Sequence, residues 1–328
     1  MKTNILKKMR NFLTLSFILL AFGVFAQDIN QAGEIFNAGN QAVKDGNSVL
    51  AIEKYDQCIE MASKLGAEGE QLVAGAKAQI PGLYAKIAAD DYKAGNTEKA
   101  IAEYENAIKF GELYGTPEIV AKAKENMPKL YYAQGNDLYK AEKYPESLAS
   151  YQKSRDLNPG YSRSIFGMGL VYSKMKDFDK MDMAFTDALA AATAEGDTKM
   201  VDKINQSAKK LLQAEGATKL QTKSWDESVK YLNLALKYDV TNKDVYYYLG
   251  LAYNGLTKWD DAIAATQKGL DYSAAENDEF KAKFYFEMGN AYKGKAMNDK
   301  ACESFKKATF GRFAENANYE IKTTLKCK

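Results

Sequence analysis

The 328-residue sequence predicts an all-α solenoid of about seven helix-turn-helix repeats. One spacing recurs along the chain: a small residue, a further residue three positions later, a small residue nine after that, an apolar residue four later and a small residue three later. A fixed internal period is the signature of stacked repeat units. Steps of three and four residues keep such positions on one side of a helix. The five prolines also fall only where a helix would begin, bend or end.

The clearest copy of this spacing runs through Gly250, Tyr253, Ala262, Thr266 and Gly269. We expect the first two positions on the first helix of a hairpin and the other three on its second helix. Small side chains let two helix backbones approach closely, and a larger side chain then fills the space beside them. The seven leading small residues are Gly39, Ala88, Gly135, Gly169, Gly216, Gly250 and Gly289.

These positions resemble the tetratricopeptide repeat, a helix-turn-helix unit of 34 residues. Pro159 also lies where that family often has a proline at the end of a unit. The resemblance covers nearly the whole chain after residue 28. It implies a right-handed superhelix whose concave groove is lined by the first helices and binds a protein or peptide.

Three repeats are longer than the family unit. The steps between leading small residues are 49, 47, 34, 47, 34 and 39, which places extra residues near 64–79, 114–127 and 194–208. Apolar residues keep helical spacing there, so we expect longer first helices in repeats two, three and five. Pro81 and Pro128 would kink these helices or start fresh ones, and a kink is the favoured interpretation. The expected repeats span about 32–65, 66–112, 113–159, 160–193, 194–241, 242–273 and 274–312, followed by a capping helix at 313–328.

Residues 1–26 are predicted to be a secretory signal peptide that is cleaved after Ala26. Four basic residues precede an apolar run from Phe12 to Phe22, and a small residue ends the segment two positions after Val24. The run is shorter than a membrane span requires, so we expect no stable span after cleavage. Cleavage would leave the mature chain periplasmic or secreted. The alternative is that residues 1–26 remain as an uncleaved anchor.

The charge balance argues against a nucleic-acid partner. The chain has 45 Lys and Arg against 43 Asp and Glu, and the predicted signal peptide holds four of the basic residues. The remaining chain is slightly acidic, whereas nucleic-acid binding usually leaves a basic surface.

Three cysteines are present. Cys58 occupies a small packing position of the first repeat, so we expect it to be buried. Cys302 begins the last second helix, and Cys327 lies near the end of the sequence. An antiparallel capping helix over 314–326 would bring these two together. In an oxidising compartment a disulfide between them is then open as an alternative to two free thiols.

Histidine is absent, which removes Ser-His-Asp and Cys-His nucleophile systems and the HExxH zinc site. No pair of acidic residues stands out for catalysis, and the cysteines lack zinc-ligand spacing. We therefore expect no enzyme activity, no cofactor and no metal site. Residues 289–296 nearly match the phosphate-binding loop, but Ala296 replaces the hydroxyl residue and no strand precedes it. We attribute Gly289 to helix packing and Gly294 to the turn within the repeat.

The resemblance implies that groove residues lie three positions before, and one, four and five positions after, each leading small residue. Aromatic residues there would supply contact area, Asn would hydrogen-bond a peptide backbone, and a row of Lys would favour acidic ligands. The aromatic residues could instead pack between repeats, and the lysines could be solvated helix ends. The candidates are Phe36, Asn40, Lys44, Tyr92, Lys93, Tyr132, Asn136, Tyr139, Lys140, Phe166, Leu170, Lys174, Tyr247, Leu251, Phe286 and Asn290.

The leading hypothesis for function is a non-catalytic scaffold of the bacterial envelope that holds a protein or peptide in this groove. The alternative is a glycan- or nutrient-binding component of an outer-surface uptake system, whose aromatic residues would stack on sugar rings. Chaperone-binding members of the family clamp a carboxylate with Lys and Asn, but Phe36, Tyr132 and Phe286 stand where the first lysine would be. We therefore do not expect chaperone-tail binding.

Overall fold

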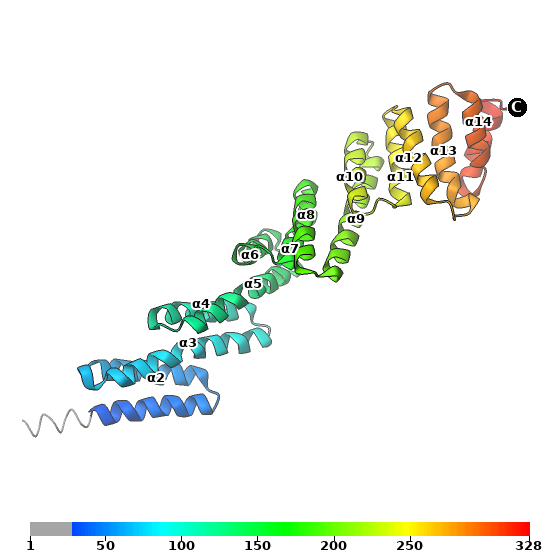
Figure 1. Ribbon diagram of the computed structural model, residues 1–328. Helices are drawn as coiled ribbons and strands as arrows, with labels where there is room; N and C mark the ends of the chain where they lie inside the picture. The colour runs from blue at the N-terminus through cyan, green and yellow to red at the C-terminus, as the bar shows by residue number, and fades with distance from the viewer. Residues whose placement is uncertain (1–27) are drawn as a thin grey trace, which may run out of the picture. The chain divides into compact units, whose positions relative to one another are not determined.

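The computed structural model describes residues 28–328, and the expected all-α fold is confirmed, with no strand within that range (Figure 1). The predicted signal peptide lies outside the described residues. Among residues 28–328, no helix combines the length and the hydropathy of a membrane span. In chain order the helices are one over 28–44, α2 (Ser48–Ser63), α3 (Glu70–Lys93), α4 (Thr97–Tyr114), α5 (Pro117–Lys140), α6 (Tyr144–Leu157), α7 (Ser162–Lys174), α8 (Phe178–Glu195), α9 (Thr198–Gln221), α10 (Trp225–Tyr238), α11 (Lys243–Gly255), α12 (Trp259–Tyr272), α13 (Asp278–Gly294), α14 (Asn298–Lys307) and α15 (Ala314–Tyr319).

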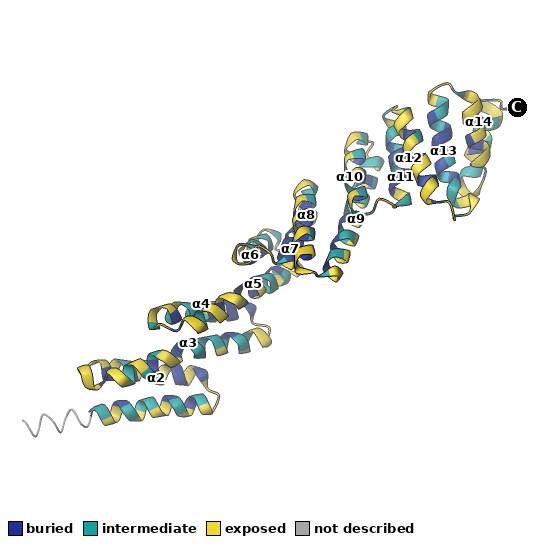
Figure 2. Cartoon of the chain, viewed as in Figure 1, coloured by how far each residue is buried: buried dark blue, intermediate teal, exposed yellow. Residues whose placement is uncertain are grey.

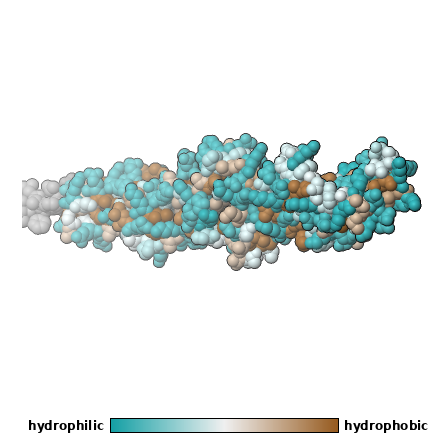
Figure 3. All heavy atoms as spheres, turned by 90° about the horizontal axis from the view of Figure 1, so that it is seen from above, coloured by the Kyte–Doolittle hydropathy of each residue, from teal (hydrophilic) through white to brown (hydrophobic). Residues whose placement is uncertain are grey.

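The chain divides into two compact units between Pro159 and Gly160. The first unit holds three hairpins, formed by the helix over 28–44 with α2, by α3 with α4, and by α5 with α6. The second unit holds four, formed by α7 with α8, α9 with α10, α11 with α12, and α13 with α14. Buried residues form stripes where the helices face one another (Figure 2). Hydrophilic residues cover most of the face seen in Figure 3, and apolar residues lie there in small patches.

The extra residues of the three long repeats lie in their first helices. Helices α3, α5 and α9 each contain 24 residues, whereas α7 and α11 each contain 13. Pro81 lies inside α3 and Pro128 lies inside α5, and both are buried. Each long helix is therefore continuous through its proline, and no fresh helix starts there.

A close contact joins the two helices of every hairpin that begins its spacing with glycine. The leading Gly faces the side chain sixteen positions later, and a Cβ added at the Gly would lie only 2.5–2.8 Å from it. These pairs are Gly39 with Tyr55, Gly135 with Tyr151, Gly169 with Phe185, Gly216 with Leu232, Gly250 with Thr266 and Gly289 with Phe305. At such a separation a methyl group has no room, so the recurring small residue is required by the approach of the two helices.

Two serines show how close the backbones come. The Ser147 hydroxyl donates to the Gly135 carbonyl at 2.7 Å, and the Ser228 hydroxyl donates to the Gly216 carbonyl at 2.8 Å. Each serine lies twelve positions after its glycine, at the first small position of the second helix. Both serines are buried, so the hydrogen bond satisfies a hydroxyl that water cannot reach.

The turn inside each hairpin is also fixed in register. One residue, always seven positions after the leading small residue, adopts the left-handed backbone conformation with φ between 57° and 84°. The seven residues are Gly46, Gly95, Glu142, Lys176, Lys223, Thr257 and Ala296. The attribution of Gly294 to this turn is wrong, because Ala296 holds the left-handed position. Gly294 instead faces the indole of Trp259, and a Cβ there would lie 2.6 Å from the ring.

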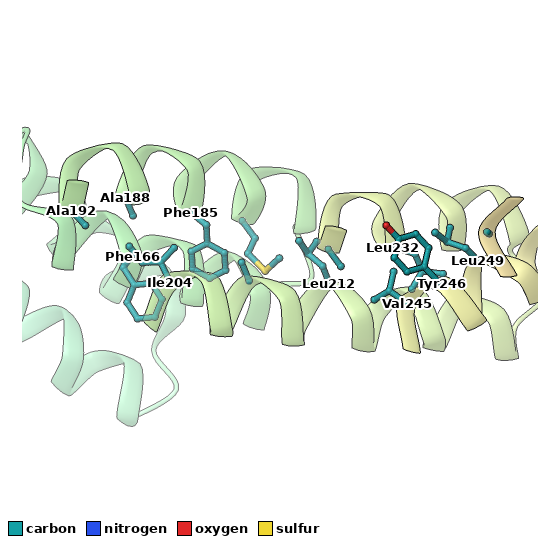
Figure 4. Packing of buried hydrophobic residues seen from close by; sticks show 14 of the residues in the cluster. Phe166, Phe185, Ala188, Ala192, Ile204, Leu212, Leu232, Val245, Tyr246 and Leu249 are labelled. Carbon is teal, nitrogen blue, oxygen red and sulfur yellow. The ribbon is translucent and has the colours of Figure 1, made fainter. Parts of the chain in front are cut away.

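Neighbouring hairpins of the second unit share one apolar core. It runs from Phe166 and Phe185 through Ile204 and Leu212 to Tyr246, and Figure 4 shows these side chains between the helices. A solenoid is stabilised in this way, since each hairpin buries its apolar face against the next one. Cys58, in the first unit, is buried and free, as expected from its packing position.

The C-terminal segment differs from a single capping helix over 313–328. A 3-10 turn, η2 (Gly311–Phe313), precedes the short α15, and a π-helical turn, η3 (Glu320–Thr324), follows it. Ile321 and Leu325 pack against a buried cluster that contains Ala301 and Phe305 of α14. Cys302 and Cys327 form a disulfide bond, with their Cα atoms 5.8 Å apart.

Gly39 and Gly33 lie in one helix and give a matched test of the helix contact. A Cβ at Gly39 would lie 2.8 Å from Cε1 of the buried Tyr55 ring, whereas a Cβ at Gly33 has nothing within 4 Å. We expect Gly39→Ala to lower the free energy of unfolding by roughly 1–3 kcal/mol through overpacking. Gly33→Ala should instead raise it by up to about 1 kcal/mol through helix propensity. Urea unfolding followed by circular dichroism measures both, and equal effects would contradict the contact.

Candidate functional site

Most aromatic candidates for the groove pack against a ring on the second helix of their own hairpin. The ring three positions before a leading glycine packs against the ring sixteen positions after that glycine. The ring centroids are 5.5 Å apart for Phe36 and Tyr55, 5.9 Å for Tyr132 and Tyr151, 5.4 Å for Phe166 and Phe185, and 5.5 Å for Phe286 and Phe305. Each of these candidates therefore contributes to the stability of its hairpin, whatever else it contacts.

Phe166 does not lie on an open face, so its assignment to the groove is wrong. Its side chain is only 4% exposed and belongs to the apolar core with Met200 and Ile204 of α9. The ammonium of Lys203, also in α9, lies 5.1 Å from its ring. All three α9 residues belong to the extra N-terminal turns of that long helix, which cover Phe166.

The Asn candidates take part in hydrogen bonds within the protein. Asn40 accepts from the Tyr55 hydroxyl at 2.7 Å, and Asn136 accepts from the Tyr151 hydroxyl at 2.8 Å. Asn290 donates to the Glu287 carboxylate at 3.3 Å. Two of the three amides therefore orient the tyrosine that packs against the leading glycine.

The four candidate lysines are the last residues of first helices. Lys44 ends the helix over 28–44, and Lys93, Lys140 and Lys174 end α3, α5 and α7. All four are exposed. Lys93 lies 3.5 Å from Asp90, and Lys140 lies 3.8 Å from Asp137. A cation at this end of a helix is favoured by the helix dipole, so their position has a structural reason apart from any ligand.

The remaining candidates differ in exposure. Tyr92 is 44% exposed and is the most open of the aromatic candidates. Tyr139 is half-buried with its ring 5.8 Å from Tyr144, and Leu170 and Leu251 are also half-buried.

Tyr247 lies in a partly buried group in the second unit. Its ring meets Phe284 at 6.2 Å and Phe313 at 6.4 Å, both edge-on. Burial raises the pKa of Tyr247 to about 12; the negative charge of Glu287 adds to the rise, and the Arg312 guanidinium opposes it. The hydroxyl therefore stays protonated at neutral pH and acts as a hydrogen-bonding group.

Glu287 is a buried acid on α13. Its side chain accepts from Asn254 at 2.9 Å and from Asn290 at 3.3 Å, and both donors reach the same carboxylate oxygen. The residue is 5% exposed, and burial raises the pKa of its carboxyl. The Oδ1 atom of Asn254 is buried beside it without a hydrogen-bond partner.

An open pocket of about 620 Å³ lies on the first-helix face of α9 and α11. Gln206 and Lys210 are exposed there, and Lys209 forms a 2.9 Å ion pair with Asp239. The residues that line it are Gln206, Lys209, Lys210, Gln213, Ala214, Ala217 and Tyr248.

This pocket was not among the residues predicted from the sequence, although the repeat spacing points to part of it. Gln213 lies three positions before Gly216, and Ala217 lies one after it. These are groove positions by the same rule that selected the other candidates. The candidates were aromatic residues, Asn, Leu and Lys at the groove positions, whereas α9 has Gln213 and Ala217 at these positions.

Within residues 28–328, no group of three or more Cys, Asp or Glu side chains is placed to hold a metal ion. The open faces offer amides, ammonium groups and aromatic edges, which suit hydrogen bonding and packing against another chain.

Neither family models nor curated proteins match the chain. Solved structures do match. YrrB, a TPR protein with an unusual peptide-binding site, is 19% identical over 58% of this chain and 90% of its own, with a TM-score of 0.34. A MamA protein is 20% identical over 61% and 96%, with a TM-score of 0.33. MamA from Desulfovibrio magneticus RS-1 is 20% identical over 58% and 97%, also at 0.33. TM-scores this low do not establish a shared overall fold. The repeat architecture follows instead from the hairpins described above.

Replacing Glu287 with Gln tests the buried acid. Because its pKa is raised above the ordinary 4.5, the folded chain keeps a proton that the unfolded chain has released, and stability falls as pH rises above that value. Glutamine cannot ionise, and its oxygen can still accept from Asn254 and Asn290. We expect Glu287→Gln to melt at a higher temperature than the unaltered chain at pH 7, and the difference to shrink toward pH 4. The exposed Glu303→Gln is the control, and a difference that does not depend on pH would contradict this account.

Proposed function

We propose that this tetratricopeptide-repeat protein is a non-catalytic scaffold that holds an extended segment of a protein partner on the first-helix faces of its hairpins. The pocket between α9 and α11 is the observation that carries the proposal. It is open, two of its residues, Gln213 and Ala217, stand at groove positions of the repeat, and Gln206, Lys210 and Gln213 present amide and ammonium groups along it. Amide side chains can pair with a peptide backbone, and a lysine favours an acidic side chain on the partner.

We further propose that the scaffold acts in the bacterial envelope, after cleavage of a signal peptide. The disulfide between Cys302 and Cys327 supports this, because such bonds persist in oxidising compartments. The basic and apolar pattern of residues 1–26 supports it independently.

Glycan binding is the weaker candidate. It would need aromatic rings with a free face, and Phe36, Phe166 and Phe286 each pack against another ring of their own hairpin.

Photo-crosslinking tests the scaffold proposal. A photoreactive amino acid in place of Gln206, in the native cell, should form a defined crosslink to one protein partner. The same amino acid in place of Lys268, exposed on the second helix α12, is the control and should not. Lys210→Glu should weaken binding of the captured partner roughly tenfold, about 1.4 kcal/mol. Equal crosslinking from the two positions would contradict the proposal, and saturable glycan binding that Lys210→Glu weakens would favour the alternative.

A further inference from the structure

The segment after α14 contacts a hairpin that is not its neighbour. In a solenoid each repeat contacts only the repeats beside it. Phe313 follows the seventh hairpin, and its ring lies 5.5 Å from Phe286 in α13 of that hairpin. The same ring lies 6.4 Å from Tyr247 in α11, which belongs to the sixth. The segment therefore crosses the first-helix face of α13 and reaches α11.

Three further features hold the segment in this place. Lys293 of α13 forms a 2.7 Å ion pair with Glu320. Gly311 has a left-handed backbone with φ of 52°, and a Cβ there would lie 2.7 Å from a carboxylate oxygen of Glu279 in α13. Glycine adopts this conformation with the least strain, and any larger residue would have to displace the Glu279 side chain. The disulfide between Cys302 and Cys327 closes a loop that contains all of η2.

The face beneath the segment receives the ring of Phe313, and the exposed Arg312 lies beside that ring. Phe313 packs between the rings of Tyr247 and Phe286. The Arg312 guanidinium lies 4.9 Å from the Phe313 ring, and its charge acts on the Tyr247 hydroxyl. The carboxyl of Glu287 lies on the same side and influences the same hydroxyl.

Contacts between α11 and α13 themselves also hold residues of this face in place. Lys283 lies 5.5 Å from the Tyr247 ring and forms a 2.6 Å ion pair with Asp244. Its side chain is only 13% exposed. Aromatic rings and paired charges held in this way form a preorganised site, which lowers the entropic cost of binding.

We propose that this face of α11 and α13 is a binding site for a peptide segment that carries an aromatic residue, and that Phe313 fills it in cis. The inference rests on the proposed function and names the chemistry of one partner segment. An occupant on a short tether has an effective concentration in the millimolar range. A partner segment must therefore displace the C-terminal segment. Only a segment that binds tightly enough to compete with the tethered Phe313 can occupy this site.

A labelled peptide with the sequence of residues 308–318 tests the site by fluorescence anisotropy on the purified full chain. The unaltered chain should bind it weakly, because its own Phe313 competes. Phe313→Ala should bind it at least tenfold more tightly. Gly311→Ala, which keeps Phe313 but strains the closed path, should shift affinity in the same direction. The control peptide carries Phe313→Ala and should bind the opened chain at least tenfold more weakly than the parent peptide does.

Two results would overturn the proposal: equal affinity of the unaltered and Phe313→Ala chains, or equal affinity of the two peptides. Adding Tyr247→Ala to Phe313→Ala should abolish binding, and retained binding would place the peptide elsewhere. Circular dichroism and a count of one free thiol confirm that each variant is folded with its disulfide intact. The crosslinking test at Gln206 uses other residues, so failure here and failure of the scaffold proposal are distinguishable.

Discussion

The structure depends on one close approach, made in six of the seven hairpins of residues 28–328, between a glycine of the first helix and the residue sixteen positions later. In six hairpins the small residue is glycine, and the atoms opposite it leave no room for a methyl group. This contact sets the register of everything around it. The left-handed turn residue always falls seven positions after the small residue. In four hairpins a ring three positions before the glycine meets the same partner side chain.

The same contact decides which residues remain for function. Rings such as Phe36 and Phe286 pack against a ring of their own hairpin, and amides such as Asn40 and Asn136 orient a packing tyrosine. The surface that remains for a partner is more polar than the aromatic candidates suggest. It includes the α9 pocket with Gln206 and Lys210, and in the last hairpins it is covered by the C-terminal segment.

The local parts of this fold could be predicted from the sequence because they follow from spacing. The hairpins, the long helices α3, α5 and α9, and the buried Cys58 all depend on residues close together in the chain. The burial of Phe166 could not be predicted in this way, since it depends on how the extra turns of α9 pack across α7. The position of Phe313 could not be predicted either, because the repeat pattern ends before it and the path of the segment depends on Gly311 and a distant disulfide.

A double-mutant cycle at Gly169 and Phe185 tests the central contact most directly. A Cβ at Gly169 would lie 2.5 Å from the fully buried Phe185 ring, so Gly169→Ala is costly only while that ring is present. The free energies of unfolding of Gly169→Ala, Phe185→Ala and the double variant give the coupling between the two sites. We expect the double variant to be more stable than the sum of the single effects by about 1–2 kcal/mol. Strict additivity would show that the two residues do not meet, and would contradict the register on which the whole account depends.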